Sequence, residues 1–257
     1  MILRILQKWI MTSTQNQTLL QFFQSPPIGA IFTSEEMEAL RPLNVAAKHY
    51  PPHTVISHQG DVEQRLFIIN SGWACSYRDL NNGDRQIIDF PLKGDVVGVV
   101  ASPGPSTDSL ASTTEISIFE MSRTAVGKAF GRSPWLAQFI LSAVARQSSI
   151  VIEHLTNAGR RNALVRTAHL LLEMDARLST FGESTQQGFD CPLTQQELAD
   201  ALGLTAIHVN RTLRDLREHN LVSFRSGFVE FLDKPRLINM IGFDKEFLGF
   251  RVFSSSP

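Results

Sequence analysis

Residues 193–216 of the chain read LTQQELADALGLTAIHVNRTLRDL, and this stretch decides the fold of the C-terminal part. We expect Thr194 to cap a first short helix that ends at Gly203, since only glycine takes up a left-handed backbone without steric cost. Thr205 is then expected to cap a second helix. Two short helices around a glycine turn are typical of a helix-turn-helix.

The second predicted helix has two distinct faces. At about 100° per residue, its apolar side chains share one face; they are Val209, Leu213 and Leu216. The side chains on the opposite face are Ile207, Arg211, Arg214 and Glu218, with His208 and Asn210 on the flanks. A helix in the major groove needs an apolar seam behind it and donors facing the bases, so we expect Arg211 to read a base. The alternative is an ordinary amphipathic hairpin with solvated arginines.

A short hairpin is predicted directly after the second helix. Residues 221–224 (LVSF) and 228–231 (FVEF) read as strands around the turn Arg225-Ser226-Gly227. A hairpin in this place forms the wing of a winged helix-turn-helix. The predicted DNA contacts are therefore Thr194, Gln195, Thr205, Ala206, Ile207, His208, Asn210, Arg211, Arg214, Arg225 and Ser226.

The N-terminal half contains short strands rich in Ile, Val and Phe, separated by turn dipeptides such as Asn82-Gly83. This pattern predicts a small antiparallel roll. Its characteristic segments are HQGD (58–61), LFIINSG (66–72), NGDRQIIDF (82–90) and KGDVVG (93–98). Together with the winged segment, they resemble the Crp/Fnr family of bacterial transcription regulators, over roughly residues 43–231.

A long helix is expected between the two parts, from residue 133 to 160. Apolar and flanking positions recur at spacings of three and four; they are Leu136, Phe139, Ile140, Ala143, Val144, Gln147, Ile150, Val151, His154 and Leu155. In the family this helix pairs with its copy in a second subunit, which implies a homodimer. The alternative is that the stripe packs on the chain's own roll.

These elements predict an α+β fold with four regions: a helical extension (1–42) that includes a helix over 1–11, a jelly-roll-like β-roll sensor domain (43–132), a dimerisation helix (133–160) and the winged helix-turn-helix domain (161–257). At 257 residues with 43% hydrophobic residues, the chain can bury two cores. No apolar run is expected to span a bilayer, so we expect a cytoplasmic protein without a membrane partner. The formal net charge is -1, so any positive charge for DNA must be local.

The chain offers little for metal or redox chemistry. Cys75 and Cys191 are its only cysteines, too few for a disulfide framework or for the four-cysteine iron-sulfur cluster of some family members. A buried Cys75 is favoured over a thiol switch. We expect no cofactor and no metal, and we expect His49, His53 and His58 to be solvated.

The sensor pocket departs from the cyclic-nucleotide-binding members of the family. Those members carry a glutamate after a glycine to bind ribose and an arginine to bind phosphate, whereas here Val99 follows Gly98 and no arginine lies in residues 103–109. Asp108 stands about where the arginine would be, beside Ser109. A carboxylate repels a phosphate, so a pocket built on these residues is not expected to bind cyclic AMP.

The sequence thus predicts a transcription regulator that binds double-stranded DNA as a homodimer, independently of cyclic AMP, and not an enzyme. The resemblance also suggests RNA polymerase as a partner; the effector is left unidentified. The alternative is a small-molecule sensor or protein-interaction module that does not bind DNA. Ile207 stands where several members have a glutamate, so the preferred half-site should differ from the family's best-known one.

Overall fold

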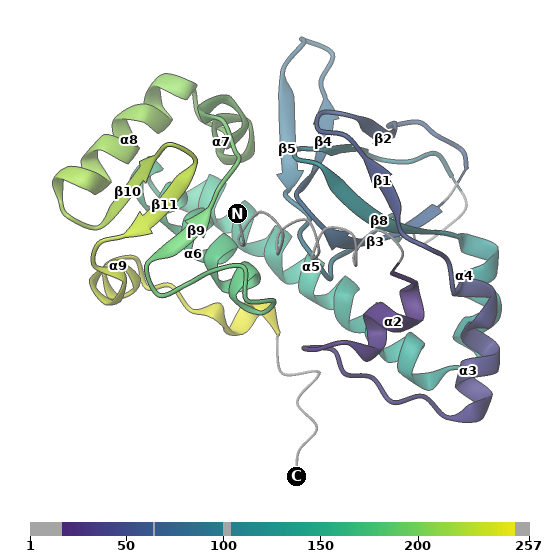
Figure 1. Cartoon of the computed structure of the whole chain (residues 1–257). Coiled ribbons are helices and arrows are strands. Elements are labelled where there is room, and N and C mark those ends of the chain that lie inside the picture. Colours follow the sequence, from purple (N-terminus) through teal and green to yellow (C-terminus); the bar gives the residue numbers. More distant parts are fainter. Residues whose placement is uncertain (1–16, 64, 100–103, 250–257) are drawn as a thin grey trace, which may run out of the picture.

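The computed structural model describes residues 17–63, 65–99 and 104–249, and it has the predicted α+β architecture (Figure 1). Two four-stranded antiparallel sheets form the roll, in the orders β1-β8-β3-β6 and β2-β7-β4-β5. Their strands are β1 (Lys48–Tyr50), β2 (Val55–Ser57), β3 (Arg65–Ser71), β4 (Ala74–Asp79), β5 (Arg85–Asp89), β6 (Val96–Val97), β7 (Ser109–Ser112) and β8 (Ile116–Ser122).

The roll encloses a small apolar core between its sheets. Its buried members are Ile56, Phe67, Ile69, Ala74, Leu110, Ile116 and Ile118. The predicted turn at Asn82-Gly83 joins β4 to β5, with Gly83 at φ 89°. The strands are uneven in length, since β6 has two residues whereas β3 and β8 have seven.

Two helices and a 3₁₀ turn precede the roll: α2 (Leu19–Gln24), α3 (Ser34–Leu40) and η1 (Arg41–Leu43). Phe23 is fully buried, and its ring centroid lies 4.8 Å from that of Trp135 and 5.1 Å from that of Phe139. The described part of the predicted extension therefore belongs to the core that covers the outer side of the roll. The helix predicted over residues 1–11 lies outside the described residues.

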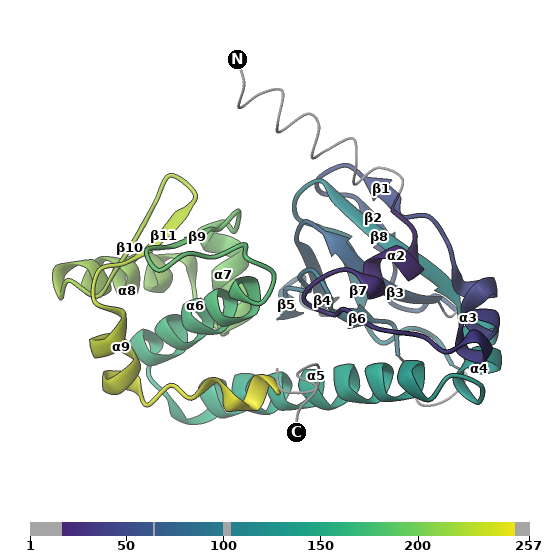
Figure 2. The same cartoon turned by 60° about the horizontal axis from the view of Figure 1, so that its bottom comes forward.

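Helix α4 (Arg123–Phe130) leads to α5 (Pro134–Arg160), which begins at the N-cap Ser133 as expected. Figure 2 shows α5 running beneath both the roll and the C-terminal domain. Half of the stripe predicted for a partner subunit is buried within the chain; its buried members are Leu136, Phe139, Ile140, Ala143 and Ile150. These five positions pack on the chain's own structure, whereas Val144, Val151 and Leu155 of the same stripe are 41%, 41% and 71% exposed.

By length and composition alone, helix α5 is also long and apolar enough to cross a membrane, which was not expected from the sequence. It bears Arg146 and Glu153 and packs against the roll. One helix of this kind does not identify a membrane span, since core helices of soluble proteins meet the same criterion.

The C-terminal domain consists of α6 (Ala163–Ser179), β9 (Gly188–Asp190), α7 (Gln195–Leu202), α8 (Ala206–Glu218), β10 (Val222–Arg225), β11 (Phe228–Phe231), α9 (Lys234–Ile241) and the 3₁₀ turn η2 (Lys245–Leu248). Its buried side chains form one cluster with residues in and next to β4 and β5 of the roll. Trp73, for example, stacks on Phe189 with ring centroids 6.4 Å apart. The two domains therefore share a hydrophobic core.

Candidate nucleic-acid interface

The first helix of the predicted helix-turn-helix is α7, and its ends are fixed as the sequence predicts. The Thr194 side chain accepts a hydrogen bond from the Glu197 backbone N–H at 3.1 Å, and the Glu197 carboxylate accepts one from the Thr194 N–H at 2.7 Å. Gly203 ends the helix in a left-handed conformation with φ 63°. This capping box and glycine stop set where the chain turns toward α8.

Helix α8 begins after the N-cap Thr205, whose hydroxyl accepts a hydrogen bond from the His208 N–H at 3.3 Å. Val209 and Leu216 are fully buried, while 81% of Ile207 is exposed. The arginines on the outer face, Arg211 and Arg214, are exposed. The predicted division of this helix into a core face and an outer face is confirmed.

Short polar contacts order the edge of the outer face. The Asn210 side-chain amide donates to Gln195 Oε1 at 3.1 Å, and His208 Nδ1 lies 3.1 Å from Thr205 Oγ1. His208 is exposed. A groove of about 450 Å³ lies at this face; it is lined by Gln195, Ala206, Ile207, Asn210, Arg211 and Arg214.

The wing forms as predicted, with β10 and β11 paired antiparallel. Arg225 and Ser226 are exposed at its turn, and Ser226 has φ 51°. The sequence did not indicate β9, which adds a third strand beside β11. The glycine at position 188 is the one sequence signal for β9. A Cβ at this position would lie 1.8 Å from the Val229 carbonyl oxygen of β11, so the close strand pairing requires glycine. Thr212 of α8, also not singled out from the sequence, is buried.

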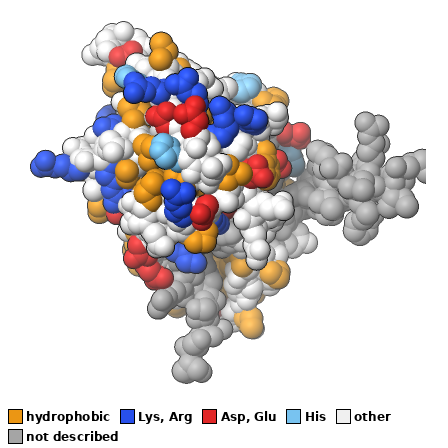
Figure 3. Space-filling view, turned by 90° about the vertical axis from the view of Figure 1, so that its left-hand side faces the viewer, with side chains coloured by type: hydrophobic (Ala, Val, Ile, Leu, Met, Phe, Trp, Pro, Cys, Tyr) orange, Lys and Arg blue, Asp and Glu red, His pale blue; other side chains and the backbone are white. Residues whose placement is uncertain are grey.

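Positive charge is local, as the net charge of -1 requires. Figure 3 shows the end of the molecule that carries α8, α9 and the wing, where Lys and Arg side chains gather with acidic groups among them. Within the described part of the chain, the ion pair of Arg214 is a long one with Glu218, 3.7 Å between Nε and Oε1. Arg211 and Arg214 are therefore available to an outside partner.

A second concavity lies between the roll and α5, at the expected sensor pocket. Its volume is about 470 Å³, and Gly98, Val99 and Asp108 line it together with Val144, Gln147, Ser148, Val151 and Ile152 of α5. Ser109 does not line it, because this buried residue turns its hydroxyl to accept a hydrogen bond from the Gln59 N–H at 2.9 Å. Three of the four predicted pocket residues are thus brought together.

The polar groups of this cavity are acidic or neutral. Asp108 accepts a hydrogen bond from the Ser76 hydroxyl at 2.5 Å, and Asp89 is the other carboxylate in the wall. Among the described lining residues there is no Lys, Arg or His. Gly98 has φ +85°, and a Cβ there would meet the Arg65 carbonyl oxygen at 2.2 Å. The wall therefore has room for a ligand but offers no cation to a phosphate.

Both parts of the chain, the roll with its cavity and the domain with α8, match known protein families. Residues 47–133 match the cyclic nucleotide-binding domain, and residues 165–240 match the Crp-like helix-turn-helix domain. The chain belongs to the Crp/Fnr family of transcription regulators. Members of this family are typically dimeric DNA-binding proteins rather than enzymes. The interpretation as a DNA-binding regulator is confirmed, and the alternative of a module that does not bind DNA is not supported.

Relatives support the same family along most of the chain. The fumarate and nitrate reduction regulatory protein of Vibrio cholerae is 29% identical over 188 residues, which are 73% of this chain and 75% of that protein. The nitrogen fixation regulation protein FixK of Rhizobium meliloti is 28% identical over 213 residues, or 81% and 94% of the two chains. The solved structure of FixK2 from Bradyrhizobium japonicum has a TM-score of 0.68 at 26% identity and covers 76% of this chain and 97% of that one.

Neither cysteine of this Crp/Fnr regulator is placed for redox chemistry. Cys75 and Cys191 are buried, and burial raises the pKa of each thiol to about 12. The exposed His49, His53 and His58 form no metal site, and within residues 17–63, 65–99 and 104–249 no group of three or more His, Cys, Asp or Glu could hold a metal ion.

Proposed function

We propose that this regulator acts as a homodimer that reads a two-fold symmetric DNA site with α8. The observation that carries the proposal is the exposed outer face of α8, where Ile207, Arg211 and Arg214 project from a helix whose opposite face is buried. Two copies of one short helix read two half-sites about one helical turn apart, which gives the length of sequence that one helix cannot read alone.

A second face of α5 supports the dimer. Six positions spaced alternately by four and three residues lie within an arc of about 80° around the helix; they are Leu141, Ala145, Ser148, Ile152, Leu155 and Gly159, and all are exposed. Leu141 is 62% exposed, Ile152 58% and Leu155 71%. This seam has the spacing of a coiled coil, and its small residues allow close approach of a second α5.

Individual contacts follow from side-chain chemistry. Arg211 can donate two hydrogen bonds to a guanine, and Ile207 can contact a thymine methyl group. We assign five further exposed residues to phosphates; they are Thr194, Thr205, His208 and the wing residues Arg225 and Ser226. The remaining contacts of the outer face are assigned to Gln195, Ala206, Asn210 and Arg214.

We further propose that the cavity of the roll does not bind cyclic AMP. Asp108 would lie near the phosphate, and the described wall holds no Lys, Arg or His to balance the two like charges. The other carboxylate of the wall, Asp89, is already paired with Arg177 and offers nothing to a phosphate. Gly98 and Val99 provide a glycine and an apolar side chain where a ribose-binding carboxylate would be needed. We place the protein in the cytoplasm, with RNA polymerase as a partner on the DNA.

The dimer and its DNA site are tested together by Ile152→Glu, which places two charges in the seam without touching α8. Analytical ultracentrifugation should show a dimer for the natural protein and a monomer for the variant. Footprinting on the upstream region of the protein's own gene should show two protected half-sites for the natural protein only. A variant that remains dimeric, or a monomer that protects DNA equally well, would contradict the proposal.

A further inference from the structure

A buried arginine of the C-terminal domain forms hydrogen bonds with residues of the roll. Arg177 lies on α6, and its guanidinium donates to Asp89 Oδ1 at 2.8 Å, to Asp95 Oδ2 at 2.6 Å and to the Phe90 carbonyl oxygen at 3.1 Å. Asp89 and Asp95 both belong to the roll, at the end of β5 and just before β6. These contacts join residues more than 80 positions apart in the sequence.

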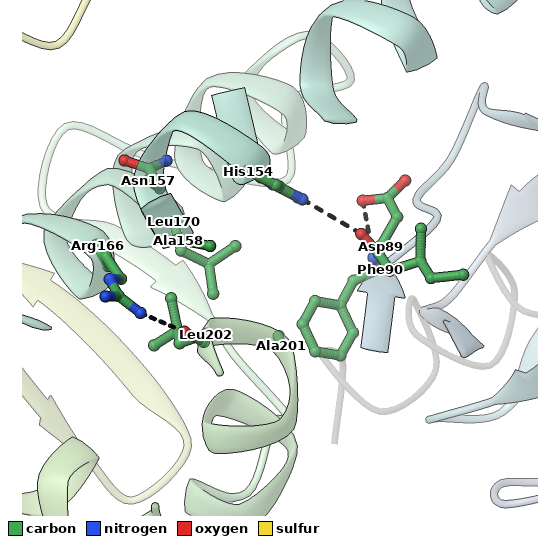
Figure 4. Close-up of a pocket in the computed structure, with 10 residues that line it drawn as sticks. Asp89, Phe90, His154, Asn157, Ala158, Arg166, Leu170, Ala201 and Leu202 are labelled. Atoms are coloured by element: carbon green, nitrogen blue, oxygen red, sulfur yellow. Dashed lines mark hydrogen bonds between the residues drawn. The ribbon is translucent and has the colours of Figure 1, made fainter. Parts of the chain in front are cut away.

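Further charges complete this junction cluster, which we define as Asp89, Asp95, Arg146, His154, Glu173 and Arg177. Arg146 Nη2 lies 2.9 Å from Asp95 Oδ1. His154 points from α5 toward β5 (Figure 4), with Nδ1 3.2 Å from the Ile88 carbonyl oxygen and Nε2 2.9 Å from Glu173 Oε2. Both ring nitrogens face acceptors, which suits the protonated imidazole. Three positive groups then balance three carboxylates.

Burial makes this cluster sensitive to geometry. The side chains of Arg177, Asp89 and Glu173 are 3%, 2% and 0% exposed. A buried charge is tolerated only while its partners stay in place, and a planar guanidinium that holds two carboxylates at once accepts little rotation. The contacts made by Arg177 therefore favour one arrangement of α6 against the roll, in addition to the apolar core that the two domains share.

The covalent link between the domains is short and not helical. Arg161 and Asn162 separate α5 from α6, and both have extended backbones, with ψ 148° and ψ 168°. Such a joint permits rotation of the C-terminal domain relative to α5 unless tertiary contacts prevent it. Because α8 packs on α6, any rotation of α6 would carry the recognition helix with it.

We propose that Arg177 is a positioning residue: held by Asp89 and Asp95, it fixes the winged helix-turn-helix domain on the roll and thereby sets the distance between the two recognition helices of the dimer. The second part rests on the proposed homodimer that reads paired half-sites. A fixed distance restricts binding to operators of one half-site spacing.

The first test measures a distance within one chain. Spin labels at Lys128→Cys on α4 and Asn239→Cys on α9, both exposed positions, report the separation of the two domains. The natural cysteines are buried and should not be labelled. Labelled chains are mixed with an excess of unlabelled protein, so that pulsed electron resonance sees only pairs within a chain. We expect one narrow distance distribution, which broadens in Arg177→Met and in the milder Asp89→Asn.

The matched control is Lys234→Met. Lys234 pairs with Asp175 inside the C-terminal domain, so its substitution removes a partly buried ion pair that does not cross the junction. We expect a lower melting temperature but an unchanged distance distribution. If Arg177→Met fails to fold, Asp89→Asn carries the test; an unchanged distribution in a folded junction variant would overturn the proposal.

The second test varies the spacing of half-sites in the DNA. Simultaneous engagement of two sites raises affinity by about 10²-fold or more when the geometry fits. The natural protein and Lys234→Met should prefer one spacing strongly, whereas the junction variants should bind several spacings with similar, weaker affinity and retain their affinity for a single half-site. Equal spacing preference in all proteins would refute the proposal. If the natural protein binds no DNA, the proposed function fails, and the distance measurement still decides whether Arg177 holds the domain.

Discussion

Replacing Arg211 with alanine tests the recognition helix most directly. Arg211 is exposed on the face of α8 opposite the buried Val209 and Leu216, so truncation removes no core packing. The free energy of unfolding should change by less than about 0.5 kcal/mol. A bidentate contact to a base is worth about 1 to 3 kcal/mol, which for two half-sites amounts to about 2 to 6 kcal/mol, or a decrease of roughly 30-fold to 10⁴-fold in affinity.

The assay is a fluorescence titration of an operator fragment and of a scrambled fragment at one fixed salt concentration. Arg211→Ala should lose affinity for the operator far more than for the scrambled DNA, because it removes sequence reading rather than general attraction. Arg236→Ala is the matched control, since it truncates another exposed arginine of the same domain on α9. An operator affinity within twofold of the natural protein, in a folded dimer, would refute the assignment of Arg211.

Three other predictions concern the wing, the sensor cavity and the domain junction. Arg225→Ala should weaken binding to operator and scrambled DNA by similar factors. The slope of log affinity against log salt concentration should flatten by about one unit for each phosphate that the arginine no longer neutralises. A selective decrease of affinity for the operator would contradict this assignment. Cyclic AMP at millimolar concentration should leave the melting temperature unchanged, whereas a ligand at a hundredfold excess over its Kd would stabilise the protein by about 2.7 kcal/mol. Burial alone lowers the pKa of His154, but Glu173 outweighs it and raises that pKa from 6.5 to about 9. The resulting stabilisation, about 3 kcal/mol, is complete below pH 6.5 and is lost as pH rises through 9; denaturant titrations should show this decrease in the natural protein and a much smaller one in His154→Gln.

The acid side of the stability profile should have a different origin. Burial lowers the pKa of His169 to about 4, against the aromatic rings of Phe243 and Phe247. His169 is neutral in the folded protein. As pH falls from 6.5 toward 4, this histidine becomes protonated in the unfolded chain but not in the folded one, so the free energy of unfolding decreases. His154 and His169 therefore limit stability at opposite ends of the pH range.

Local features of this protein were determined by the sequence itself. Thr194, Gly203 and Thr205 place the ends of α7 and α8, because caps and a left-handed glycine act within a few residues. The outward position of Arg211 follows from helical periodicity alone, once Val209 and Leu216 mark the core face. The turn at Gly83 likewise follows from a local signal, the dipeptide Asn82-Gly83.

Contacts between distant segments were decided only by the tertiary structure. Periodicity along α5 shows that its faces differ, but it does not show which face the roll covers; Ile140 and Ala143 pack within the chain, while Ile152 and Leu155 remain exposed. No local pattern pairs Arg177 with Asp89, 88 residues away, because the energy of a buried ion pair depends on where folding brings the two groups. Local sequence signals thus determine the surface that contacts DNA, whereas long-range packing determines where that surface lies relative to the roll.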